Sequence, residues 1–195
     1  MRKSLLALAV AFLFLPRPAF AHTEGGTAAG FFSGFGHPIS GWDHIVAMVA
    51  VGLWGAQLGA PALWLLPVTF PMMMAFGGML GLAGAPIPGV EIGIALSALV
   101  LGLMVAMEAK PPLPVAMGMV AVFAIFHGHA HGAELAPGTS ALAYSLGFVV
   151  STGCLHGVGI LLGLIHTWPQ GQRVLRGAGA LVALAGALFL GRIFV

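Results

Sequence analysis

The feature that most constrains this sequence is a succession of long apolar runs separated by short breaks rich in proline and glycine. A helix needs about 20 apolar residues to cross the hydrocarbon core of a bilayer. Proline and glycine favour turns, so each break predicts the end of a helix. The sequence therefore predicts an all-α integral membrane protein with six transmembrane helices. The six runs lie at roughly 41–59, 62–84, 89–108, 112–131, 140–166 and 174–194.

The composition excludes an ordinary soluble domain. Hydrophobic residues make up 59% of the chain and charged residues 6%, whereas about a quarter of the residues in a soluble domain are charged. The net charge of +2 rests on so few side chains that it indicates no nucleic acid partner. Cys154 is the single cysteine, so no internal disulfide can form. We expect the lipid bilayer to be the main surroundings of the chain.

The first 21 residues have the layout of a secretory signal peptide. Arg2 and Lys3 precede a short apolar stretch, and the segment "AFA" that ends at Ala21 fits a cleavage site. We expect residues 1–21 to be removed, which leaves one permease domain over 22–195. The alternative is an uncleaved seventh helix, but this apolar stretch is short for a membrane span.

The few basic residues predict how the chain is oriented in the membrane. If the mature N-terminus lies outside, Lys110, Arg173 and Arg176 fall in cytoplasmic loops, and Arg192 alone lies on the external side. An excess of basic residues in cytoplasmic loops is the usual pattern in membrane proteins. We therefore expect a multi-pass protein of the bacterial cytoplasmic membrane, with its mature N-terminus in the periplasm.

Histidines and carboxylates gather where three predicted spans reach the outer face. Asp43 and His44 begin the first span, Glu91 begins the third, and His127 and His131 end the fourth. An ionisable residue inside a span is costly, which makes it a functional candidate by default. We expect these groups to form one metal-binding cluster at the outer face.

Helical spacing makes this cluster more specific. Met48 follows His44 by four residues, and His131 follows His127 by four, so each pair shares a helix face. Glu134 continues the second stripe if the helix extends that far. Imidazole and carboxylate donors together suit divalent first-row transition metals. We expect Met48 to lie one turn inward from the cluster.

Other histidines have weaker claims. His156 lies deeper, in the fifth predicted span, and shares a face with Thr152, so it is a candidate relay for the ion. A hydrogen bond to a neighbouring helix would explain it equally simply. If processing exposes His22, its amine and imidazole form a candidate external capture site, which His129 could join. A floppy terminus is the alternative for His22.

Simpler explanations exist for the outer groups when they are taken one at a time. Asp43 follows Ser40 by three residues, which is also the pattern of a helix cap. Glu91 alone could be an interfacial carboxylate. The tract "HGHAHG" could bind metals without specificity, as short histidine-rich tracts do. The coincidence of three such groups at one depth favours the metal site.

Three segments resemble the HupE/UreJ family of nickel permeases, which are hydrogenase or urease accessory proteins. They are "HPISGWDHIVAMVAVG", "FHGHAHGAEL" and "STGCLHGVGI". The resemblance implies an exported, six-span chain in which His37, Asp43 and His44 recognise the metal, with residues 127–134 and His156 as further candidates. Five residues separate His37 from Asp43, whereas the related nickel/cobalt transporters have four in that place.

Together with these patterns, the resemblance implies a secondary permease that imports a divalent transition metal for metalloenzyme maturation. Nickel(II) is the first expectation and cobalt(II) the alternative, each as transported substrate and not as a permanent cofactor. A homo-oligomer and a cytoplasmic metallochaperone remain open as partners. The sequence lacks the G-x-x-x-x-G-K-[ST] phosphate loop of an ATP-driven pump.

Two other classes of function fit parts of the pattern. An intramembrane zinc hydrolase would also use histidines and carboxylates from several helices. No H-E-x-x-H segment is present to favour that enzyme. An external metal sensor or chaperone would need the histidine-rich tract but not His156.

Overall fold

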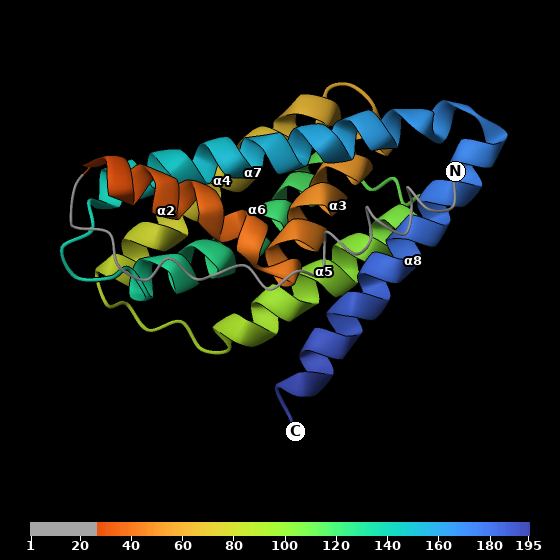
Figure 1. The fold of residues 1–195 in the computed structure, drawn as a ribbon. Coiled ribbons are helices and arrows are strands. Elements are labelled where there is room, and N and C mark those ends of the chain that lie inside the picture. Colours follow the sequence, from red (N-terminus) through yellow and green to blue (C-terminus); the bar gives the residue numbers. More distant parts are fainter. Residues whose placement is uncertain (1–26) are drawn as a thin grey trace, which may run out of the picture.

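The computed structural model describes residues 27–195, and over that range all regular structure is helical. The predicted signal peptide and His22 lie outside these residues. Figure 1 shows the helices packed in a single layered body, with α8 slanting across one end. The elements are α2 (Thr27–Ser40), α3 (Trp42–Leu58), α4 (Ala62–Leu82), α5 (Val90–Ala106), α6 (Leu113–Ala133), α7 (Ala141–Gly163), the short 3₁₀ helix η1 (Leu164–Thr167) and α8 (Pro169–Arg192).

Each predicted span coincides with one helix from α3 to α8, but their lengths do not all suit a full crossing. Among the described residues, α4, α6, α8 and α7 continued by η1 are long and apolar enough to cross a membrane. Helices α2 and α3 qualify only together, as one span bent by 81°. At 17 residues, α5 is shorter. The structure therefore supports four crossing helices, or five with the bent pair, and does not confirm the predicted six.

Helix α2 is the element that the sequence pattern does not predict. It contains Pro38, is rich in glycine and has 14 residues, too few for the apolar run of a span. It ends at Ser40, whose Oγ donates a hydrogen bond to the carbonyl of His37 at 2.7 Å. The next helix begins after Gly41, which is its N-cap without a side-chain bond. The capping interpretation of Ser40 and Asp43 is therefore wrong.

Close helix pairs are built on small residues. Helix α4 packs against α6, α5 against α8, and α7 against both α2 and α3. Gly128 and Gly132 of α6 lie directly on the α4 backbone at Met74 and Gly78, where a Cβ atom would overlap the carbonyl oxygens. Small residues allow such close approach where lipid provides no hydrophobic drive for association. Glycine at these two positions therefore allows α4 and α6 to pack backbone against backbone.

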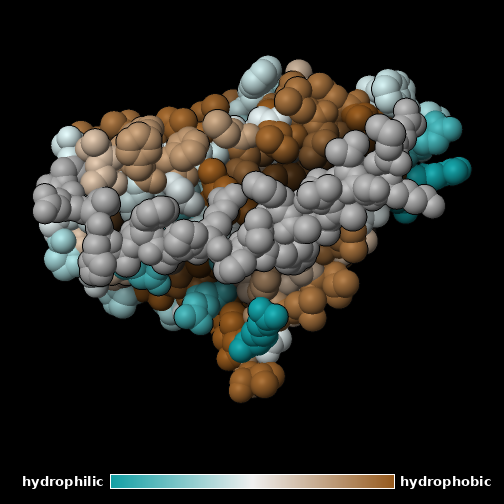
Figure 2. All heavy atoms as spheres, viewed as in Figure 1, coloured by the Kyte–Doolittle hydropathy of each residue, from teal (hydrophilic) through white to brown (hydrophobic). Residues whose placement is uncertain are grey.

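Both the interior and the exposed surface of the described residues consist largely of apolar side chains. Trp54, Phe70 and Leu101 are fully buried in the core, while Leu142, Leu161 and many other large hydrophobic side chains are exposed. Figure 2 shows hydrophobic residues over most of the visible described surface, with the hydrophilic residues confined to a few places near its edges. An apolar exterior of this extent suits lipid and not water, as expected of a multi-pass membrane protein.

Candidate metal-binding site

Three histidines from three helices meet at the junction of α2, α3 and α6. His37, His44 and His131 each offer a ring nitrogen, and these nitrogens all lie within 4.8 Å of one another. His44 and His131 are buried and His37 is half-buried. The ring centroids of His37 and His131 are 4.5 Å apart. We call these three residues the histidine cluster.

The bend between α2 and α3 brings the first two of these histidines together. His37 lies in the last turn of α2 and His44 in the first turn of α3, and their ring centroids are 5.7 Å apart. Gly41 lies at the bend in an extended conformation. A Cβ atom there would lie 2.7 Å from Oδ1 of Asp43 and 3.0 Å from Nδ1 of His44. Glycine therefore leaves these two side chains the room they occupy.

Asp43 contacts the outer side of the His44 ring. Its Oδ1 lies 2.9 Å from Nδ1 of His44, although the angle is not that of a hydrogen bond. The negative charge favours the tautomer with its proton on Nδ1. Nε2 of His44 then accepts a hydrogen bond from Nε2–H of His131, at 2.8 Å. Metal-binding histidines commonly have such a carboxylate on the other ring nitrogen.

His127 adds a fourth imidazole with a free nitrogen. Ser97 of α5 donates its only hydroxyl proton to the carbonyl of Ile94 at 2.6 Å. Its Oγ must therefore accept from Nε2–H of His127, at 2.9 Å. Nδ1 of His127 is left buried without a partner, and the ring centroid lies 5.0 Å from that of His44. Nδ1 is thus the His127 atom available to a metal ion.

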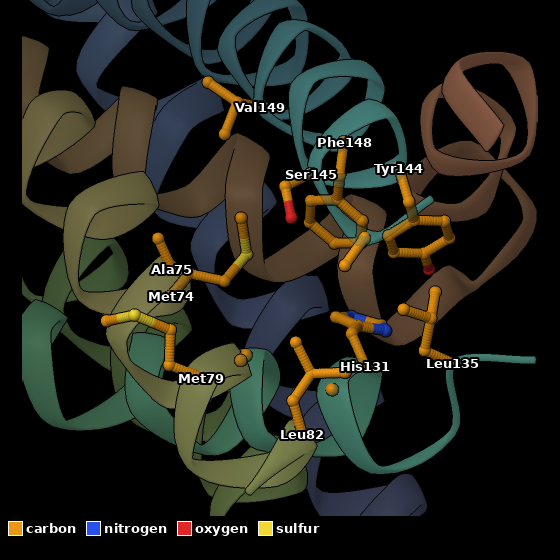
Figure 3. A pocket seen from close by; sticks show the side chains of 14 residues that line it. Met74, Ala75, Met79, Leu82, His131, Leu135, Tyr144, Ser145, Phe148 and Val149 are labelled. Atoms are coloured by element: carbon orange, nitrogen blue, oxygen red, sulfur yellow. The ribbon is translucent and has the colours of Figure 1, made fainter. Parts of the chain in front are cut away.

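Aromatic side chains of α7 close one side of the cluster. The ring centroid of Phe148 lies 4.5 Å from that of His131, and the ring centroid of Tyr144 lies 6.2 Å from that of His37. Figure 3 shows His131 at one end of a small cavity, with Tyr144 and Phe148 above it and Leu82 and Leu135 beside it. The cavity has a volume of about 90 Å³ and lies between α4, α6 and α7. A few water molecules fit in this space next to the His131 imidazole.

Comparison with known proteins gives the family. A model of the HupE / UreJ protein family matches residues 10–189. This chain belongs to the HupE/UreJ family. It is 47% identical to Protein HupE of Rhizobium leguminosarum bv. viciae over 190 residues, which cover 97% of this chain and 99% of that protein. No solved structure matches the chain.

The family resemblance seen in the sequence is therefore confirmed, and it extends over nearly the whole chain. Its three motifs fall on parts of the HupE/UreJ fold that are close in space. The first covers the α2–α3 bend, the second the end of α6, and the third the middle of α7. His44 and His131 contact each other, and the His156 ring lies 5.4 Å from Phe70, which also packs on His127.

The predicted carboxylates do not all join the histidines. Glu91 is exposed in the first turn of α5, where it lines a separate cleft of about 350 Å³ with Trp42, Asp43 and Arg192. Glu134 is exposed at the C-cap of α6, because the helix ends at Ala133 and the predicted stripe ends with it. Within residues 27–195, neither belongs to the group of three converging histidines. Asp43 borders both the cleft and the cluster.

The remaining predicted residues have other surroundings. Met48 lies one turn below His44, fully buried in the hydrophobic core. Nε2–H of His129 donates to the carbonyl of Ala85 at 2.7 Å, which fixes the loop between α4 and α5. His156 is buried on α7, where its ring packs against Phe70.

Two residues that contact the buried histidines, Ser97 and Phe70, were not predicted from the sequence. Ser97 is a polar residue in the middle of the apolar segment "IALSALV", and that contrast was the available signal. Phe70 carried no signal, because an aromatic residue in an apolar span is ordinary. Its ring lies 5.6 Å from His127 and 5.4 Å from His156, measured between centroids. Only the packing of α4 against α6 and α7 shows that it contacts both histidines.

Proposed function

We propose that this HupE/UreJ protein is a secondary permease that imports nickel(II) from the periplasm into the cytoplasm for the maturation of a metalloenzyme. The observation that supports this function best is the convergence of the three cluster nitrogens within 4.8 Å. His127 adds a fourth nitrogen donor beside them. Imidazole nitrogens suit nickel(II), and their burial between helices suits an ion that passes through the membrane.

The proposed chemistry is a partial exchange of the hydration shell. Nitrogen atoms of His44 and His131 replace water on the ion, which breaks the hydrogen bond that now joins the two rings. Asp43 compensates the charge of the ion through His44. The small cavity beside His131 leaves space for retained water. A transport site must release its ion, so an incomplete ligand set is expected.

A zinc-dependent hydrolase is the candidate from another class, and the geometry favours it less. Such an enzyme needs a carboxylate free to act as a general base beside the metal-bound water. Asp43 is the carboxylate nearest the cluster in the described part of the chain, and it is already in contact with His44. Cobalt(II) remains the alternative ion for the permease, since the same donors bind it.

Uptake by cells tests the proposed function. We expect nickel-starved cells that express the wild type to accumulate radiolabelled nickel, and cells that express His44→Ala to accumulate no more than empty cells. His166→Ala is the matched control, since the Nδ1–H of His166 donates to the carbonyl of Gly163 in its own turn. Excess unlabelled nickel should block uptake better than cobalt or zinc. Equal uptake in all strains would contradict the proposal.

A further inference from the structure

Helix α7 carries a second set of buried polar side chains, apart from the histidine cluster. His156 is 1% exposed and Thr152, one turn earlier on the same face, is fully buried. Neither ring nitrogen of His156 has a hydrogen-bond partner, and Oγ1 of Thr152 has none. A neutral imidazole has one donor and one acceptor, and buried polar groups are nearly always paired. Two adjacent unpaired residues therefore leave polar atoms that a bound ion or a water molecule would satisfy.

The two prolines of α4 supply an oxygen atom at the same place. Pro71 has no N–H, so it cannot donate the helical hydrogen bond to the carbonyl of Pro67, four residues earlier. That carbonyl is the Pro67 backbone group that approaches the His156 imidazole. The contact falls short of a hydrogen bond, since both ring nitrogens stay unpaired. The freed carbonyl of α4 thus lies beside the His156 imidazole of α7, and the buried Thr152 hydroxyl lies one turn earlier on the same face of α7.

Phe70 links this group to His127, the imidazole next to the histidine cluster. Its fully buried ring contacts His127 on one side and His156 on the other. The depth of the group follows from α3, because Gly52 packs against the backbone of His156. Gly52 follows His44 by eight residues, which is about 12 Å along a helix. The polar group therefore lies about two helical turns farther along α3 than the cluster.

We propose that His156, the Pro67 carbonyl and the Thr152 hydroxyl form a second, inner site for the divalent metal ion, which reaches it by displacing the Phe70 ring. This inference rests on the proposed import function and adds a second binding site along the transport path. One imidazole with two neutral oxygens binds a transition metal more weakly than several imidazoles do. An ion that leaves the cluster would thus find a weaker site from which it can dissociate.

Nickel titration of the purified full chain tests this site. The wild type should show two classes of nickel site, the tighter one lost in His44→Ala and the weaker one lost in His156→Ala. His156→Gln keeps a polar side chain that can hydrogen-bond. If His156 has only a structural role, this variant should retain the weaker class of nickel site. If His156 binds the ion, the weaker class should be lost as in His156→Ala. Cys154→Ala, on an exposed position of the same helix, should retain both classes.

The prolines provide a second, independent variant. Pro71→Ala restores an N–H that can donate a hydrogen bond to the Pro67 carbonyl. We therefore expect the nickel affinity of the weaker class of site to fall about tenfold, although His156 is unchanged. Pro67→Ala removes the other proline but leaves that carbonyl without a helical donor, so its effect should be smaller. An effect of Pro67→Ala equal to that of Pro71→Ala would indicate a general change in helix shape and overturn the role of the carbonyl.

Transport kinetics separate the failure of this inference from the failure of the proposed function. In proteoliposomes, His156→Gln should lower the maximal rate of nickel uptake about tenfold and leave the concentration for half-maximal uptake within about twofold. If uptake depends on His44 while His156→Gln keeps the wild-type rate and both classes of site, the inner site is wrong and the permease stands. If the wild type neither binds nor moves nickel, both proposals fail.

Discussion

At the residue scale, the role of each site side chain follows from which of its atoms already have partners. Asp43 contacts Nδ1 of His44 at 2.9 Å, whereas the converging atoms of the cluster are all imidazole nitrogens. The sequence pattern treats Asp43 and His44 as equal ligands. The geometry favours a different division, in which the carboxylate orients and polarises the ring and the ring binds the ion.

This division predicts a graded effect. Asp43→Asn keeps the size of the side chain and removes its charge, so we expect nickel affinity of the purified protein to fall about 10- to 100-fold without being abolished. His44→Ala should abolish the tight site, and calorimetric titration with nickel compares the two. If Asp43→Asn is as severe as His44→Ala, Asp43 is a direct ligand and the division is wrong.

Ser97 leads to a second prediction at this scale. Ser97→Ala removes the acceptor for Nε2–H of His127, so the ring is free to rotate or change tautomer, and nickel affinity should fall about tenfold. Ser97→Thr keeps the hydroxyl group, so its nickel affinity should equal that of the wild type. Nitrogen NMR of labelled histidine reports the tautomer directly. An unchanged His127 signal in Ser97→Ala would refute the role assigned to the hydroxyl.

The candidate site was partly predictable because helical periodicity is local. Four-residue spacing puts His127 and His131 on one face, and both are buried side by side in α6. Glu91 and Glu134 lie at helix ends that the predicted topology puts at the outer face, yet depth says nothing about which side of a helix faces the cluster. That information depends on how distant helices pack, so the separation of Glu91 from the histidines was not visible in the sequence.

At the element scale, the bend between α2 and α3 is the device that assembles the site. Helix α2 was not predicted because glycine and proline have low helix propensity, and because 14 residues are too few for a membrane-spanning run. Its packing against α7 compensates for weak local propensity. The half-buried His37 owes its position to this helix, so the histidine cluster could not be drawn from the predicted spans alone.

Gly41 makes the importance of the bend testable. A Cβ atom at residue 41 would crowd Asp43 and His44, so Gly41→Ala should displace both side chains and raise the nickel concentration for half-maximal uptake about tenfold. Gly36→Ala is the matched control, because a Cβ atom at Gly36 of α2 would meet nothing within 4 Å. Radiolabelled uptake at several nickel concentrations compares the two. Equal curves for both variants would contradict the role of the bend.

At the scale of the whole molecule, apolar runs predicted the helices well, because lipid requires every exposed helix face to be apolar. The structure does not confirm the number of crossings that they predict. Helix α5 has 17 residues, about 26 Å, which is shorter than the hydrocarbon core. The α2–α3 pair changes direction by 81° in the middle of a qualifying stretch. Hydropathy records neither a bend nor the packing that buries a short helix.

If nickel crosses the membrane through the histidine cluster, as we propose, transport by the protein must depend on His44. The most direct measurement is nickel accumulation in proteoliposomes that contain only the purified wild type or His44→Ala, driven by an inward nickel gradient. We expect saturable accumulation with the wild type and none above protein-free liposomes with His44→Ala. Accumulation at the same rate with both proteins, or with neither although both are folded, would contradict it.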